Sequence, residues 1–206
     1  MKSFFLNDPK MLIYGFMIIF FGSYGQTFFI ALFNDDIKNY YSLTDGQFGL
    51  IYALSTTLSS LLLINVAKLI DFIDLRIYSI IITTGLIITC ISIYILPFNI
   101  FYLVIIILSL RFFGQGAMTH AGITSLTRYF GKDRGKAISF GNLGGMLGVM
   151  FLPIIVVYFK NFFSFREIWL FSSLSLIIFL PILYITLNNQ KQRQKKFKES
   201  IQGSFK

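Results

Sequence analysis

The sequence is poor in the residues on which most enzyme and metal chemistry depends. It holds one cysteine and one histidine, and Asp and Glu together number nine among 206 residues. A lone cysteine excludes an intrachain disulfide. No carboxylate lies deep in an apolar stretch, so His120 and Cys90 have no companions for a metal site. We therefore expect no metal, no cofactor and no enzymatic activity.

Charge is also scarce, whereas long apolar stretches are abundant. Charged residues make up 13% of the chain and hydrophobic residues 55%, although a soluble domain has about 25% charged residues. A helix needs about 20 apolar residues to cross a bilayer, and six stretches qualify: 11–33, 44–67, 77–96, 100–126, 137–159 and 165–187. None alternates as a barrel strand does. The sequence predicts an all-α polytopic membrane protein with six transmembrane helices.

The six stretches leave little of the chain for any other domain. We expect a cytoplasmic N-terminus at 1–10, one transmembrane domain at 11–187 and a basic tail or linker at 188–206. The first apolar stretch is longer than the 7 to 15 residues of a signal-peptide core, and no small-residue cleavage site follows it. We therefore expect it to be retained as a membrane span.

The net charge of +9 is unevenly placed along the chain. Fourteen Lys and Arg residues lie in the N-terminus, the loops after the second and fourth stretches and the tail, and only three lie on the opposite side. The positive-inside rule then places both termini in the cytoplasm, and we expect a plasma (inner) membrane protein. The tail "QKQRQKKFK" could bind lipid or nucleic acid, but a solvated linker is the simpler interpretation. We expect the bilayer as surroundings and no nucleic-acid partner.

Two short motifs mark helix starts on the side opposite the termini. In "TDGQ", Thr44 precedes Gln47 by three residues, and in "SFRE", Ser164 precedes Glu167 in the same way. This spacing is typical of a capping box, in which two side chains satisfy the first backbone groups of a helix.

The first three and last three stretches have opposite orientations, as inverted repeats do in secondary transporters. The first stretch of each triplet is interrupted by a Gly-rich polar patch, "GSYGQT" at 22–27 and "GQGAMTH" at 114–120. Matching interruptions of this kind indicate a transporter binding site. The alternative is that the glycines only allow close helix packing.

Arg111 is the one charged residue deep within an apolar stretch. Such a residue costs at least about 2.5 kcal/mol to insert and normally faces the bundle interior or a wet cavity. Helical spacing places Gln115 on its face, and Gln26 lies at a similar depth in the first stretch together with Tyr24. We predict that Arg111, Gln26, Gln115 and Tyr24 bind substrate. The alternative is that Arg111 only ties two helices together.

The lone histidine follows Arg111 by nine residues, which is two and a half turns of an α-helix. We therefore expect His120 on the opposite face of the helix, out of reach of a small ligand on Arg111. With an ordinary pKa of about 6.5 it could relay protons. A helix-packing role is the alternative.

Three segments resemble motifs of the major facilitator superfamily, and specifically its N-terminal six-helix half. They are "AKLIDFIDLR" at 67–76, Arg111 with Gly114 and Gly116, and "RYFGKDRGKAISFGNLGG" at 128–145. The resemblance implies a secondary transporter and assigns conformational roles to Asp71 and Arg76. The glycine and proline pattern that marks the superfamily's antiporters is absent, which argues against drug antiport.

The fifth stretch carries small residues at every fourth position, including Gly141 and Gly145. This spacing is typical of a close helix-packing face. Thin helices also let two packed elements slide, so we assign Gly141 and Gly145 a role in conformational change.

The resemblance also implies a partner, since superfamily members usually have twelve helices. The chain is therefore expected to be a fragment or a half-size protein that pairs with a C-terminal six-helix half or a second copy. The arginine and a loop resembling the monocarboxylate and oxalate/formate branch favour a small organic anion as substrate. The alternatives are an assembly or regulatory role, or an intramembrane hydrolase, for which the required Gly-x-Ser-Gly motif is missing.

Overall fold

A computed structural model describes residues 4–5, 8–95, 97, 99–195 and 197. All regular structure in these ranges is helical. Leu96 at the end of the third predicted stretch, Lys2, and residues 196 and 198–206 of the predicted tail lie outside the described residues.

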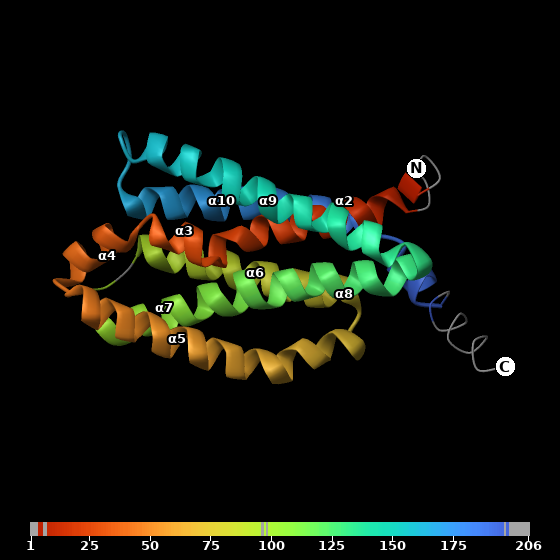
Figure 1. The fold of residues 1–206 in the computed structure, drawn as a ribbon, viewed down its shortest axis with the longest axis horizontal. Helices are drawn as coiled ribbons and strands as arrows, with labels where there is room; N and C mark the ends of the chain where they lie inside the picture. Colours follow the sequence, from red (N-terminus) through yellow and green to blue (C-terminus); the bar gives the residue numbers. More distant parts are fainter. Residues whose placement is uncertain (1–3, 6–7, 96, 98, 196, 198–206) are drawn as a thin grey trace.

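The helices lie side by side along the longest axis of the molecule (Figure 1). In chain order they are α2 (Pro9–Gly22), η1 (Ser23–Gly25), α3 (Thr27–Ala31), α4 (Asn34–Tyr41), α5 (Asp45–Val66), η2 (Ala67–Asp71), α6 (Leu75–Tyr94), α7 (Ile100–Leu110), η3 (Arg111–Met118), α8 (Thr119–Phe130), η4 (Gly131–Asp133), α9 (Arg134–Phe159) and α10 (Phe165–Thr186). The elements η1, η2 and η4 are 3₁₀ turns, whereas η3 is a π-helix.

Five continuous helical runs in the described residues are long and apolar enough to cross a membrane, against six predicted stretches. The difference lies in the run Ile100–Phe159, which has 60 residues. A straight helix of that length would extend about 90 Å, but this run turns back at Gly131, where φ is +47°. α8 then packs against α9. The expected loop between the fourth and fifth stretches is therefore a helical turn.

Both predicted capping boxes are confirmed. The Thr44 side chain accepts from the Gln47 amide while the Gln47 side chain accepts from the Thr44 amide, and Ser164 and Glu167 form the same pair at the start of α10. These bonds satisfy backbone donors that would otherwise be left unpaired where the helices begin.

α9 packs closely along α2 because glycines replace side chains at the contact. A Cβ atom on Gly144 would overlap the carbonyl oxygen of Phe16, and one on Gly148 would overlap the Ser23 hydroxyl. A Cβ on Gly145 would lie 3.2 Å from the Ile19 side chain, and Gly141 faces Ile19 and Leu126. The predicted small-residue packing face is thus present.

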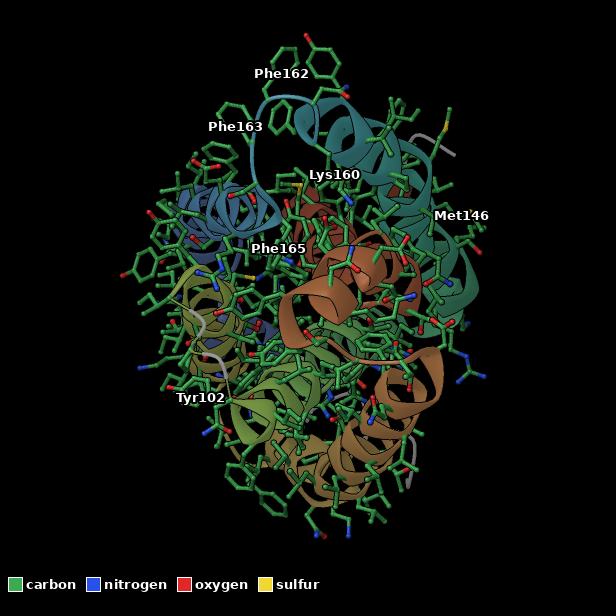
Figure 2. All side chains as sticks on the ribbon, turned by 90° about the vertical axis from the view of Figure 1, so that its left-hand side faces the viewer. Tyr102, Met146, Lys160, Phe162, Phe163 and Phe165 are labelled. Carbon is green, nitrogen blue, oxygen red and sulfur yellow. The ribbon has the colours of Figure 1, made fainter. Side chains whose placement is uncertain are left out.

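Large apolar side chains cover much of the outer surface of the bundle. Tyr102 and Phe162 project away from its centre in Figure 2, and each is at least 45% exposed. An exposed apolar surface of this extent fits hydrocarbon rather than water as the surroundings.

Both described ends of the chain lie at one end of the bundle, together with η2 and η4 (Figure 1). This agrees with the grouping of loops that the charge count predicts. The side of the membrane on which this end lies stays a prediction.

The basic side chains at the opposite end are engaged locally. Lys38 contacts Asp45 at 2.6 Å and Asp35 at 2.9 Å, and these hydrogen bonds raise its pKa. Lys160 pairs with Asp36 at 2.5 Å, and Arg166 lies 4.4 Å from the centre of the Tyr40 ring. Three of the acidic residues and every Lys and Arg residue at this end thus have partners.

The described part of the tail is docked against the bundle. The guanidinium of Arg193 donates to both carboxylate oxygens of Asp8, which also caps α2 by accepting from the Met11 amide. Gln190 is 2% exposed and donates to the Tyr129 hydroxyl. The interpretation of the tail as a solvated linker is therefore wrong for Gln190 and Arg193, because Tyr129 of α8 binds Gln190 and Asp8, which caps α2, binds Arg193.

Candidate functional site

The two Gly-rich interruptions predicted from the sequence lie against each other at the centre of the bundle. In the first span, α2 gives way to η1, and the backbone at Gln26 is extended with ψ of 152° before α3 begins. In the fourth, the π-helix η3 replaces α-helical turns over Arg111–Met118. π-helical turns inside α-helices occur frequently at functional sites.

Glycine permits this contact because the two backbones touch directly. A Cβ atom built on Gly114 would lie 2.6 Å from Gly25 Cα, and one on Gly22 would lie 2.9 Å from the carbonyl oxygen of Gly114. A Cβ on Gly25 would overlap the carbonyl oxygen of Leu110. Any larger residue at these positions would separate the broken helix from η3.

Arg111, at the start of η3, is 9% exposed and is bound on one edge only. Its Nη1 donates to Thr27 Oγ1 at 2.9 Å and, more weakly, to the Gly25 carbonyl at 3.4 Å. Its Cζ lies 5.5 Å from the centre of the Tyr52 ring. Nε is buried and has no hydrogen-bond partner in the described part of the chain. The guanidinium therefore keeps unused donors although it is buried.

A pocket of about 270 Å³ lies between α5, η3 and α8, and we call it the basic pocket. Its lining residues are Thr56, Ser59, Ser60, Leu63, Arg111, Gln115, Gly116, Thr119, His120 and Ile123. Most of these side chains can donate hydrogen bonds, and no carboxylate is among them. The pocket is therefore suited to a small ligand with negative charge.

His120 lines the basic pocket together with Arg111, so the prediction that it lies on the opposite face is wrong. A π-helix bonds residue i to i+5 and fits more residues into each turn than an α-helix does. The nine residues from Arg111 to His120 therefore complete less than two and a half turns of the helix. His120 Nε2 lies 3.4 Å from Thr124 Oγ1. Its role as a proton relay stays a prediction.

The other predicted binding residues are divided between different surroundings. Gln115 lines the basic pocket as expected, and its buried Oε1 has no partner among the described residues. Tyr24 instead packs toward α10, where its hydroxyl bonds to Ser175 Oγ at 2.8 Å. Tyr24 does not line the basic pocket.

Gln26 does not line the basic pocket, although it was expected beside Arg111. The extended backbone at Gln26 turns its side chain into a second pocket, so the flanking Gly25 and Thr27 contact Arg111 instead. This second pocket, the neutral pocket, has a volume of about 360 Å³ and is lined by Ile19, Ser23, Gln26, Phe28, Thr119, Asn142, Gly145, Met146 and Val149. Thr119 lines both pockets.

Sequence reasoning missed three residues of this region. Thr27 accepts hydrogen bonds from both Arg111 and Tyr52, the second at 3.2 Å, and Asn142 lines the neutral pocket. Two of these residues could have been found from the sequence, because Thr27 lies inside the first Gly-rich patch and Asn142 lies between glycines. Nothing in the sequence distinguishes Tyr52 from other span tyrosines.

Asp71 and Arg76 lie away from both pockets, where they tie helix ends together. Asp71 forms an ion pair with Arg128 at the end of α8. Arg76 donates to the carbonyl oxygens of Leu187 at 2.7 Å and Asn188 at 2.8 Å, and so satisfies acceptors where α10 ends. The conformational roles assigned to Asp71 and Arg76 stay predictions, as do those of Gly141 and Gly145.

No three His, Cys, Asp or Glu side chains gather as a metal site within the described ranges. Cys90 is buried.

A family model described as Major Facilitator Superfamily matches residues 13–206, which include all the residues of both pockets. No curated protein and no solved structure matches the chain.

Proposed function

The chain belongs to the major facilitator superfamily, a family of transporters, and on this premise we propose that it carries a small organic anion across the membrane by alternating access. The observation that carries the proposal is the buried, half-satisfied guanidinium of Arg111 in the basic pocket.

The charge of Arg111 supports an anion as the ligand. Among the described residues no carboxylate lines the basic pocket, and the hydrogen bonds of the guanidinium go to neutral oxygens. Charged side chains within a membrane normally pair with an opposite charge or with backbone carbonyls, and the carbonyl contact of Arg111 is long. A carboxylate could accept two parallel hydrogen bonds from an arginine fork, and such bonds are stronger than those between neutral groups.

We propose that the chain crosses the membrane six times, with the run Ile100–Phe159 crossing twice because it turns back at Gly131. The first crossing of each triplet is interrupted, at η1 and at η3, which supports an inverted repeat. The loop charges support cytoplasmic ends and a plasma (inner) membrane location.

We also propose that these six crossings form one half of a transporter. A second six-helix unit, either a C-terminal half or another copy, would cover both pockets. The resemblance of a loop to those of the monocarboxylate and oxalate/formate branch supports an organic anion as substrate.

Binding and uptake of labelled carboxylates by the full-length protein would test this function. Arg111→Lys keeps the charge but loses the fork, so we expect about tenfold weaker binding, and Arg111→Gln should weaken it further. Arg134→Lys, at the exposed first residue of α9 and outside both pockets, is the matched control and should bind as the original protein does. Unchanged affinity for every carboxylate in Arg111→Gln would overturn the proposal.

A latch between two access states is the alternative role for Arg111, because it holds the fourth span to Thr27 of the first. In that case carboxylate affinity would survive in Arg111→Lys. The balance of inward-facing and outward-facing states, measured by cysteine accessibility, would shift instead.

A further inference from the structure

The neutral pocket contains polar side chains whose hydrogen-bonding capacity the protein does not use. Ser23, Gln26 and Asn142 line it, and their side chains make no hydrogen bond within the described residues. Oγ1 of Thr119, on the shared wall, also has no partner there. The interior of a membrane protein normally satisfies such groups internally or with a ligand or water.

The chemistry of the neutral pocket differs from that of the basic pocket. No charged side chain lines it, and two of its polar groups are amides, which both donate and accept. The rest of its lining is apolar, from Ile19, Phe28, Met146 and Val149. A pocket with a neutral polar edge and an apolar face matches a chain or ring of carbon atoms that carries hydroxyl groups.

The two pockets are adjacent because both use Thr119 as a wall. Their volumes, about 270 and 360 Å³, provide much more room than a carboxylate group alone requires. One ligand could therefore place its carboxylate at Arg111 and extend past Thr119 toward Asn142.

We infer that the neutral pocket holds the hydroxylated body of the same anion whose carboxylate binds Arg111, so that the substrate is a polyhydroxylated carboxylate of the sugar-acid class. This inference rests on the proposed function and narrows its substrate. An unsubstituted alkyl chain fits less well, because it would remove water from Gln26 and Asn142 without replacing the lost hydrogen bonds.

Isothermal titration of the full-length protein with gluconate and hexanoate tests the inference. Both acids have six carbon atoms and one negative charge, and they differ in their hydroxyl groups. We expect gluconate to bind at least about tenfold more tightly, because a site built to hydrogen-bond hydroxyls discriminates strongly against an analogue lacking them.

Variants on the two sides of Thr119 should separate the binding of the hydroxyl groups in the neutral pocket from the binding of the carboxylate at Arg111. Asn142→Leu, and independently Gln26→Leu, should weaken gluconate binding about fivefold each, as expected for a lost hydrogen bond, and leave hexanoate binding unchanged. Met150→Leu is the matched control, because Met150 lies on the same helix as Asn142 and lines neither pocket. Arg111→Gln should weaken both acids equally.

The outcomes distinguish this inference from the function on which it rests. Equal binding of the two acids, binding of neither, or full gluconate affinity in both leucine variants would overturn the hydroxyl subsite. If the two acids bound equally, or if both leucine variants kept full gluconate affinity, the anion site at Arg111 would still stand provided that Arg111→Gln weakened binding. Unchanged binding in Arg111→Gln would instead contradict the proposed function.

Discussion

At the scale of single residues, Thr27 decides how the buried guanidinium of Arg111 is held. Its hydroxyl oxygen accepts from Arg111 at 2.9 Å and from Tyr52 at 3.2 Å, and thereby joins the first, second and fourth spans. The only other hydrogen bond of Arg111 in the described chain is the long one to Gly25. Loss of the Thr27 hydroxyl therefore leaves a buried charge nearly without partners.

We expect Thr27→Val, which keeps the side-chain shape, to lower the free energy of unfolding by about 1–2 kcal/mol, since a hydrogen bond to a charged group is lost. Thr57→Val is the control, because the Thr57 hydroxyl bonds only to Ala53 within its own helix. Thermal unfolding of the purified protein measures both changes. Equal shifts in the two variants would contradict the role given to Thr27.

At the scale of elements, the site depends on two irregular helices that fit together. The break between α2 and α3 and the widened turn of η3 occur where Gly22, Gly25 and Gly114 bring the two backbones into contact. An uninterrupted α-helix in either position would direct different side chains into the pockets. The geometry of each irregular segment thus depends on the other segment.

Gly25→Ala tests this dependence, because its Cβ would overlap the carbonyl oxygen of Leu110. We expect a destabilisation of about 1–3 kcal/mol, typical of overpacking. Gly46→Ala, with no atom within 4 Å of its Cβ, should instead be neutral or stabilise α5 by about 0.5–1 kcal/mol. Chemical or thermal unfolding compares the two. A Gly25→Ala protein as stable as Gly46→Ala would show that η1 and η3 are not in close contact.

At the scale of the whole molecule, the bundle presents an apolar outer surface and has two polar ends of different character. The end with both described chain ends carries most of the Lys and Arg residues, whereas the cations at the other end are engaged by acidic or aromatic side chains. This asymmetry supports the orientation with the termini in the cytoplasm.

Labelling of single cysteines in intact cells tests this orientation. Asn39→Cys, at an exposed position on α4, should react with a membrane-impermeant maleimide, whereas Lys132→Cys in η4 should react only after permeabilisation. Cys90 is fully buried, so the native background should be low. Labelling of position 132 from outside would reverse the proposed topology.

The sequence by itself determined the helical class, the membrane setting, the helix starts at Asp45 and Phe165, and the location of the two interruptions. These properties are local, since they depend on apolar length, cap spacing and glycine content within one segment. The sequence also identified Arg111 as a candidate functional residue, because a charged side chain within an apolar span is costly to insert into the membrane.

Only the tertiary structure decided which side chains share a pocket. His120 shares a pocket with Arg111 because η3 is wound as a π-helix, and Gln26 shares a pocket with Asn142 rather than with Arg111 because the backbone is extended at Gln26. The docking of Arg193 on Asp8 joins residues 185 positions apart. In each case the direction of a side chain is set by contact between distant segments, and no periodicity within one segment contains that information.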